Sequence, residues 1–247
     1  MQLFITEYTI KNKTVSIQDI DLLSQLRKVL RANIGDVIRI QSPVNKTKKI
    51  RYEVRVDAWD NKHIAGTILS EHLHESTPNT TTMIIAMPNK WDKVELIVQK
   101  LTECGLDQIL FWPSERSVIK ERNSKKEERL HKIMKEAVEQ SRGRKLPKLE
   151  FTTDITKYLQ DSEVVVFDKT VTKEITPPQP SPLHGEGAGG EVTTISGLVG
   201  PEGGLTPRDY QIFEAYTPKI MSLGETVLRM ETAAIVGGRL LKNSDKL

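Results

Sequence analysis

Apolar and polar residues alternate in short runs along the N-terminal part of the chain. Such runs are typical of strands that have one face in a core and the other in water. They lie at residues 3–8, 36–41, 50–58 and 63–69. One helical segment, at about 20–30, interrupts them. Residues 1–73 are therefore expected to form a small β-barrel with a packed helix.

Beyond residue 82 the pattern changes to longer elements in which strands and helices alternate. The stretch 74–82 before them is polar, contains Pro78 and lacks periodicity, so it is expected to be a linker to a second domain at 83–247. Strands are predicted at 83–87, 108–112, 163–167 and 195–199, and helices at 90–104 and 125–142. This alternation predicts an α/β fold with a parallel sheet.

Two loops marked by glycine follow apolar runs near the C-terminus. The first, Gly-Pro-Glu-Gly-Gly at 200–204, precedes a predicted helix with Thr206 as N-cap, Pro207 at its first position and Asp209 closing a capping box. The second follows a predicted strand at 219–223, which Gly224 ends, and a helix is expected from about Glu231. Both loops should open at the same end of the parallel sheet, where ligands bind in open α/β folds.

The residue types of the first loop suit a ligand that approaches the main chain. Gly200, Gly203 and Gly204 permit positive φ and close approach, and Glu202 is the one ionisable side chain in the turn. The fingerprints of nucleotide triphosphate and dinucleotide sites are absent, because no Gly-Lys-Ser/Thr ending and no G-x-G-x-x-G occurs. By itself the pentapeptide fits an ordinary tight turn better than a ligand-binding loop.

Composition and charge narrow the class of protein. The 247 residues carry a net charge of +3, with the basic residues concentrated at 46–55 and 116–148, and these runs fit either nucleic-acid contact or solvated surface. The single cysteine, Cys104, excludes an internal disulfide and a Cys-based zinc site, and no metal site is expected. The first ten residues do not read as a signal peptide and no stretch reaches the length of a membrane span, which favours a cytoplasmic protein.

One segment fits neither domain. Residues 176–190 are rich in proline and glycine and have no apolar face, so they cannot form a packed element. We expect a disordered insertion at about 174–192, without a part in catalysis.

The two glycine loops together resemble a known family. Gly-Pro-Glu-Gly-Gly followed by Leu-Gly-x-x-Val-Leu-Arg-x-Glu-Thr-Ala is similar to the cofactor-binding end of the SPOUT methyltransferases, and most closely to the ribosomal RNA small subunit methyltransferase E family. The resemblance extends to residues 91–120, to Glu-Ala-Val-Glu-Gln-Ser-Arg at 136–142, and to Val-Leu-Arg at 29–31 followed by Gly-Asp at 35–36. The chain departs from the family pattern at Gln2 and at 21–23.

This resemblance implies a fold, a cofactor and a reaction. The fold is a C-terminal α/β trefoil knot with a parallel sheet, preceded by a PUA-like RNA-binding β-barrel. The reaction is methylation of N3 of a specific uridine in 16S ribosomal RNA, with S-adenosylmethionine as donor. The implied partners are the small ribosomal subunit and a second copy of the chain, bound through the C-terminal domain.

The resemblance also suggests roles for individual residues. Donor binding is expected at Leu198, Val199, Gly200, Glu202, Gly203, Gly204, Leu223, Gly224, Leu228, Met230 and Thr232. Arg229 is expected to stabilise the developing uracil oxyanion, and Glu202 or Glu231 to orient the base or accept its proton, although Glu231 also suits a helix start for electrostatic reasons alone. RNA contacts are expected at Arg31, Lys48, Arg51, Arg116, Lys120, Arg142 and Arg144.

Two alternatives share these features. An RNA-binding assembly factor without catalysis would keep the barrel, but the complete Gly-Pro-Glu-Gly-Gly and Leu-Arg-Met-Glu-Thr-Ala loops argue against it. A SPOUT enzyme acting on another RNA would keep the knot, whereas the N-terminal barrel and the Ser-Glu-Arg-Ser segment at 114–117 favour the 16S uridine family.

Overall fold

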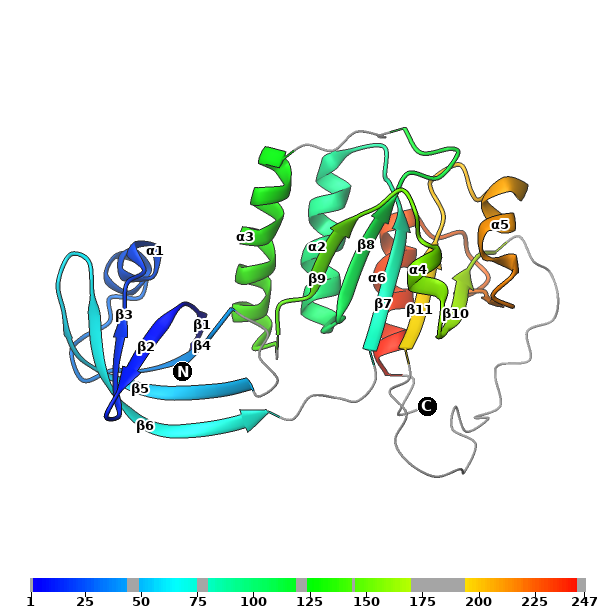
Figure 1. Cartoon of the computed structure of the whole chain (residues 1–247). Helices are drawn as coiled ribbons and strands as arrows, with labels where there is room; N and C mark the ends of the chain where they lie inside the picture. Colours follow the sequence, from blue (N-terminus) through cyan, green and yellow to red (C-terminus); the bar gives the residue numbers. More distant parts are fainter. Residues whose placement is uncertain are drawn as a thin grey trace, which may run out of the picture. The chain divides into compact units, whose positions relative to one another are not determined.

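The computed structural model describes residues 2–43, 49–74, 80–118, 124–143, 145–169 and 194–243 (Figure 1). The chain divides into two compact units. Unit 1 comprises Met1–Ser76 with Lys135–Leu146, and unit 2 comprises Thr77–Met134 with Pro147–Leu247. Among the described residues, no helix combines the length and the apolar character that crossing a membrane requires.

Unit 1 contains a six-stranded sheet in the order β1-β4-β5-β6-β3-β2. All neighbours in it are antiparallel except β1 and β4, which run parallel. The strands are β1 (Leu3–Ile5), β2 (Tyr8–Lys11), β3 (Thr14–Ile17), β4 (Val37–Gln41), β5 (Lys49–Trp59) and β6 (Ile64–His74). Alternate residues point into one core, as Val15 and Ile17 of β3 or Val54 and Val56 of β5 show.

The predicted helix at 20–30 is present but changes its winding half-way. It begins as α1 (Ile20–Ser24), where the Asp19 side chain accepts a hydrogen bond from the backbone N–H of Leu22, and continues as a π-helix, η1 (Gln25–Val29). Leu22, Leu23 and Leu26 are buried in the unit 1 core. The helix and strands β1, β4, β5 and β6 thus match the sequence pattern, whereas the antiparallel pair of β2 and β3 was not predicted.

Unit 2 is organised around a parallel six-stranded sheet in the order β12-β10-β11-β7-β8-β9. Its strands are β7 (Thr80–Ala86), β8 (Gln108–Trp112), β9 (Lys148–Phe151), β10 (Ser162–Phe167), β11 (Thr194–Val199) and β12 (Lys219–Met221). Its helices are α2 (Trp91–Cys104), α3 (Ser124–Ser141, whose last part belongs to unit 1), α4 (Thr156–Leu159), α5 (Pro207–Glu214) and α6 (Met230–Lys242). β9 and α4 are two elements that the sequence pattern did not predict.

Helix α6 packs against β11, β7 and α2 at very close range. A Cβ atom at Gly237 would lie 2.7 Å from the Phe167 ring, and one at Gly238 would lie 2.5 Å from Leu101 Cδ2. On the sheet side, a Cβ atom at Gly197 would lie 2.3 Å from Leu241 Cδ1. Glycine at these three positions is therefore what allows the C-terminal helix to approach the sheet.

The predicted domain limits differ from the observed units. Residues Lys135–Leu146, which the sequence pattern assigns to the 83–247 domain, group with unit 1. There the Glu139 carboxylate accepts a 2.8 Å hydrogen bond from the backbone N–H of Ile5. Of the predicted linker at 74–82, His74 ends β6 and residues 80–82 belong to β7, while residues 75–79 lie outside the described part of the chain. Residues 170–193, which contain the predicted insertion, also lie outside it.

Candidate active site

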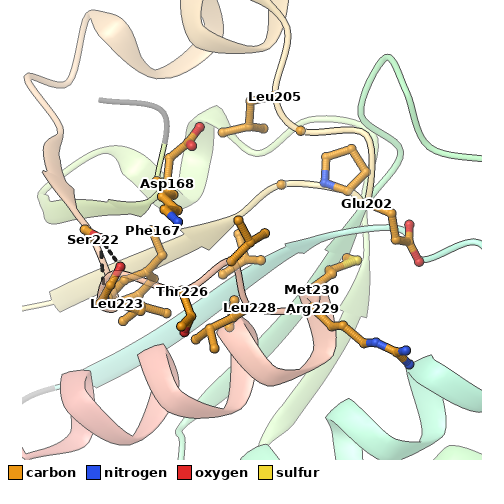
Figure 2. Close-up of a pocket in the computed structure, with 18 of the residues that line it drawn as sticks. Phe167, Asp168, Glu202, Leu205, Ser222, Leu223, Thr226, Leu228, Arg229 and Met230 are labelled. Carbon is orange, nitrogen blue, oxygen red and sulfur yellow. Dashed lines mark hydrogen bonds between the residues drawn. The ribbon is translucent and has the colours of Figure 1, made fainter. Parts of the chain in front are cut away.

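A pocket of about 760 Å³ lies in unit 2 at the carboxyl ends of β10, β11 and β12 (Figure 2). Its walls are the glycine-rich loop at 200–205 and the segment 222–230 that leads into α6. The two loops predicted to open at one end of a parallel sheet therefore lie together, because β11 and β12 both pair with β10.

The first loop is anchored where it becomes a helix. Thr206 and Asp209 form the expected capping box at the start of α5, with Pro207 in the first turn. Glu115 adds two hydrogen bonds: its carboxylate accepts one from the Thr206 hydroxyl at 2.5 Å, and its backbone N–H donates one to Asp209 at 3.1 Å. The end of the loop is thus fixed both by its own helix and by the 113–118 segment.

The glycines of this loop have different physical roles. Only Gly204 has positive φ, at 73°. Gly200 is required for space, since a Cβ atom there would lie 2.8 Å from Leu205 Cγ. A Cβ atom at Gly203 would lie 3.3 Å from Arg116 Cδ, and the Gly203 carbonyl accepts a 2.5 Å hydrogen bond from the Arg116 guanidinium. Of the three glycines that permit positive φ, only Gly204 adopts it, whereas Gly200 and Gly203 leave space for neighbouring side chains.

The second loop is more open. Gly224 has φ of 126°, and the Ser222 hydroxyl donates to the Gly224 carbonyl at 3.0 Å and accepts from its N–H at 3.3 Å (Figure 2). The Lys169 ammonium donates to the Glu225 carbonyl. Val227 at the tip has 80% of its surface exposed. A short turn braced by one lysine thus presents apolar and main-chain groups to the cavity.

The pocket has an apolar middle and polar groups on two sides (Figure 2). Phe167, Leu223 and Leu228 line the middle. Asp168 lies on one side, where its carboxylate accepts a 2.5 Å hydrogen bond from the Tyr210 hydroxyl, and Glu202 and Arg229 lie on the other. An elongated ligand with a flat apolar part and polar ends would match this distribution.

On the Glu202 side of the pocket, a lysine lies between two carboxylates. Lys93 Nζ, from the first turn of α2, lies 2.6 Å from Glu202 Oε1 and 3.4 Å from Glu231 Oε2. The three side chains are 23%, 31% and 13% exposed, respectively. The Glu231 oxygen accepts no hydrogen bond of regular geometry from the described residues, so its contact with Lys93 is an ion pair at longer range.

This arrangement shifts two pKa values. Burial by itself would raise the pKa of the Glu202 carboxyl, but hydrogen bonds from Lys93 and from backbone N–H groups outweigh it, and the net pKa is lowered. The hydrogen bond to Glu202 likewise raises the pKa of Lys93, against an opposing effect of burial. A carboxylate that is held ionised and already bonded to an ammonium is a poor proton acceptor.

Arg229 differs from its neighbours in having no such partner. Its backbone occupies the N-cap position of α6, where its carbonyl accepts a hydrogen bond from the Ala233 N–H, and its side chain is exposed. The guanidinium makes no hydrogen bond or ion pair with residues that the structure describes. Figure 2 shows the guanidinium extending on the same side of the pocket as Glu202. It is therefore available to a ligand at the pocket mouth.

Most residues expected to bind the donor line the pocket. They are Val199, Gly200, Glu202, Gly204, Leu223, Gly224, Leu228 and Met230. Three do not line it: Leu198 is fully buried within β11, Gly203 faces Arg116, and Thr232 is exposed on α6. Both predicted loops border the pocket, although not every residue of them faces the cavity.

The sequence did not predict several of the lining residues. Lys93 comes from α2, and Phe167, Asp168 and Lys169 come from the end of β10, whereas Ser222 and Thr226 belong to the second loop itself. The β10 residues reach the pocket because β10 lies between β11 and β12 in the sheet. The sequence pattern predicts where the strands are, but it does not predict which strands are neighbours in the sheet.

The residues expected to contact RNA fall into three groups. Arg31 and Arg142 are exposed, and both have positive φ. Arg51 donates to Gln41 at 2.8 Å and to the carbonyls of Arg142 and Gly143 within unit 1, and Arg116 donates to Gly203, so these two guanidinium groups brace loops. The predicted contacts Lys48, Lys120 and Arg144 lie outside the described residues.

The sequence of this chain matches a known protein family. The profile of the RNA methyltransferase domain family matches residues 75–242, which include all of the pocket. The chain belongs to this family. The expected family and fold class are thereby confirmed: unit 2 is an α/β knot-type methyltransferase domain with a parallel sheet, and unit 1 is a barrel-like β domain.

Individual relatives agree with this assignment. The chain is 32% identical to the ribosomal RNA small subunit methyltransferase E of Bacillus subtilis over 59% of each chain, and 25% identical to that of Rickettsia conorii over 95% of this chain and 91% of the relative. The crystal structure of the Neisseria gonorrhoeae ribosomal RNA small subunit methyltransferase E bound to S-adenosyl methionine is similar in fold, with a TM-score of 0.76 and 21% identity over 96% of this chain and 95% of that one.

Proposed function

We propose that this protein methylates N3 of a specific uridine in 16S ribosomal RNA, with S-adenosylmethionine as the methyl donor. The proposal rests above all on the 760 Å³ pocket between the two glycine loops of a chain that belongs to the RNA methyltransferase domain family. Its relatives named ribosomal RNA small subunit methyltransferase E supply the substrate class.

The pocket suits the donor in shape and polarity. We infer that the adenine lies in the apolar middle, between Leu223 and Leu228, where main-chain groups of 199–200 and 223–228 provide its hydrogen bonds. Asp168 would accept hydrogen bonds from ribose hydroxyls or from the amino group of the methionine part, since its carboxylate faces the cavity.

The reaction requires positioning more than covalent chemistry from the protein. The N3 lone pair of the uridine forms a bond to the methyl carbon while the carbon–sulfur bond breaks and its electron pair goes to sulfur, and N3 loses its proton. Arg229 is exposed and unpaired among the described residues, so we assign to it the stabilisation of negative charge on the uracil oxygens.

Of the two candidate proton acceptors, Glu202 is the less suitable, because Lys93 holds it ionised by a 2.6 Å contact and lowers its pKa. We assign to Glu202 an orienting role. Glu231 has the longer 3.4 Å contact and is the better candidate for the acceptor, directly or through water.

RNA binding and assembly complete the proposal. We infer that residues 1–73 bind the RNA together with basic residues of the 116–148 segment. Arg31 and Arg142, whose side chains are exposed, would contact it, and the positive charges of Lys48, Lys120 and Arg144 would add to the affinity. We also propose a homodimer through the C-terminal domain and a cytoplasmic location, both in keeping with an enzyme that modifies ribosomal RNA.

One series of measurements tests the proposal. The purified chain is titrated calorimetrically with S-adenosylmethionine, and 16S RNA from small subunits incubated with both is then mapped by mass spectrometry. Binding together with new N3-methyluridine is the expected result. Binding with methylation of another RNA would overturn the substrate, and absence of binding would favour an assembly factor without catalysis.

A further inference from the structure

Lys93 is the pocket residue whose side chain contacts both glycine-marked segments at once. Its ammonium lies 2.6 Å from Glu202 of the first loop and 3.4 Å from Glu231, in the first turn of the helix that follows the second loop. It reaches them from a third element, α2, and thus connects two segments that are far apart in sequence.

The helix that carries Lys93 does not favour a lysine at this place. Lys93 lies in the first turn of α2, where the unpaired N–H groups of the helix create a partial positive charge that repels a cation. On the same helix, Lys100 is 38% exposed and contacts Glu103 at i+3, an ordinary surface pair. Lys93 is therefore at a locally unfavourable position that the two carboxylates offset.

The carboxylates in turn depend on Lys93. Glu231 is only 13% exposed, and the ammonium is its one described ion-pair partner. Without Lys93, two negative charges near the same position would repel each other, and each would lose a charged donor in a half-buried setting. The expected response is movement of the first loop away from α6.

We propose that Lys93 is a positioning residue: by joining Glu202 to Glu231 it fixes the spacing of the two segments between which the methyl donor binds. The inference rests on the proposed function, and it assigns to Lys93 no contact with the reacting atoms. Lys93 acts on donor affinity through the geometry of the pocket walls.

The test compares Lys93→Met with wild type and with Lys100→Met, which removes the same charge from the same helix outside the pocket. Donor affinity is measured by calorimetric titration with S-adenosylmethionine, together with the melting temperature. Lys93→Met should weaken binding about 10-fold and raise KM for the donor in parallel, while Lys100→Met stays within about twofold.

A double-mutant cycle separates positioning from general loss of stability. Once Glu202→Gln has removed one end of the bridge, Lys93→Met should cost much less affinity than it does in the wild type. Additive losses, or wild-type affinity in Lys93→Met, would overturn the inference. If Lys93→Met does not fold, Glu202→Gln and Glu231→Gln form the cycle instead, with losses predicted to be less than additive.

The outcomes also distinguish this inference from the proposed function. A wild-type protein that does not bind S-adenosylmethionine refutes the proposed function, whatever the variants do. A wild-type protein that binds it, with additive losses in the variants, leaves the proposed function intact and removes Lys93 from it.

Discussion

Helix α6 has a lysine–carboxylate contact at each end, and the two contacts are built for different purposes. At its C-terminal end, Lys242 Nζ lies 3.0 Å from Asp107, whose side chain is only 3% exposed and also accepts two 2.8 Å hydrogen bonds from Thr81. At its N-terminal end, Glu231 shares Lys93 with Glu202 beside an open pocket. The first contact is buried within the fold, whereas the second lies beside a pocket that a ligand can enter.

One helix can therefore be anchored at one end and serve a binding site at the other. The Asp107 contact joins the end of α6 to the start of β7 and to the residue before β8. It lies at the amino ends of these strands, whereas the pocket lies at the carboxyl ends of the sheet. Glycine at 197, 237 and 238 lets the middle of α6 pack closely against its neighbours. With its C-terminal end and middle fixed, α6 can present its N-terminal turn to the pocket at a constant place.

The largest effect is expected from breaking the buried end. Asp107→Ala leaves the Lys242 ammonium and both Thr81 donors without their acceptor, and should lower the free energy of unfolding by about 3–5 kcal/mol. Urea unfolding followed by circular dichroism measures this. As a control, Lys100→Met removes an exposed pair and should change stability by less than about 0.5 kcal/mol. Equal effects of the two variants would show that the Asp107 contact is not an anchor.

The next effect concerns catalysis at the open end. Arg229→Ala should reduce kcat at least about 100-fold, because removal of one charge-stabilising donor typically has that size, while donor affinity changes by less than about threefold. The measurement is methyl transfer to small subunits together with calorimetric titration. Arg239→Ala, on the same helix, is the control. Near-normal kcat in Arg229→Ala would exclude Arg229 from the mechanism.

A smaller effect, which a second substitution should partly rescue, is expected in the first loop. In Gly200→Ala the new methyl group meets Leu205 Cγ at 2.8 Å, so the loop must shift, and donor affinity should fall about 10-fold. The double variant Gly200→Ala/Leu205→Ala removes the clash and should recover part of the affinity. If the second substitution only adds to the loss, crowding by Leu205 is not the reason for glycine at 200.

The smallest effect is a pH dependence of the Glu202 contact. Its folded-state pKa is lowered, so its stabilisation is fully present above the ordinary glutamate value of about 4.3 and is lost as the pH falls through the lowered value. Because the side chain is 31% exposed, the contribution should be below about 1 kcal/mol. Wild type and Glu202→Gln should therefore differ in stability at pH 6, and the difference should shrink as the pH falls below the ordinary glutamate value. A difference that grows towards acid would contradict the lowered pKa.

Local sequence signals predicted local structure well. The strand at 108–112 is found as β8, the helix at 90–104 as α2, and the capping box at Thr206 and Asp209 has the expected hydrogen bonds. Each of these depends on residues close together in the chain, where hydrophobic periodicity and capping chemistry act directly. The two-loop pocket followed from placing both loops at one end of a parallel sheet.

Long-range contacts could not be predicted in the same way. The bridge through Lys93 joins residues more than a hundred positions apart in the chain, and no local pattern distinguishes Lys93 from the exposed Lys100. Asp168 enters the pocket because β10 lies between β11 and β12, which depends on strand order. Arg51 and Arg116 look like free cations in the sequence, but backbone carbonyls hold them in the fold.

Hydrogen–deuterium exchange with and without S-adenosylmethionine locates the bound donor on the chain. If the donor binds between the two loops, amides at 200–205 and 222–230 should exchange more slowly when it is present, with little change at Asp107 and Thr81 at the far end of the sheet. Binding that protects other segments and neither of these loops would show that the pocket is not the donor site.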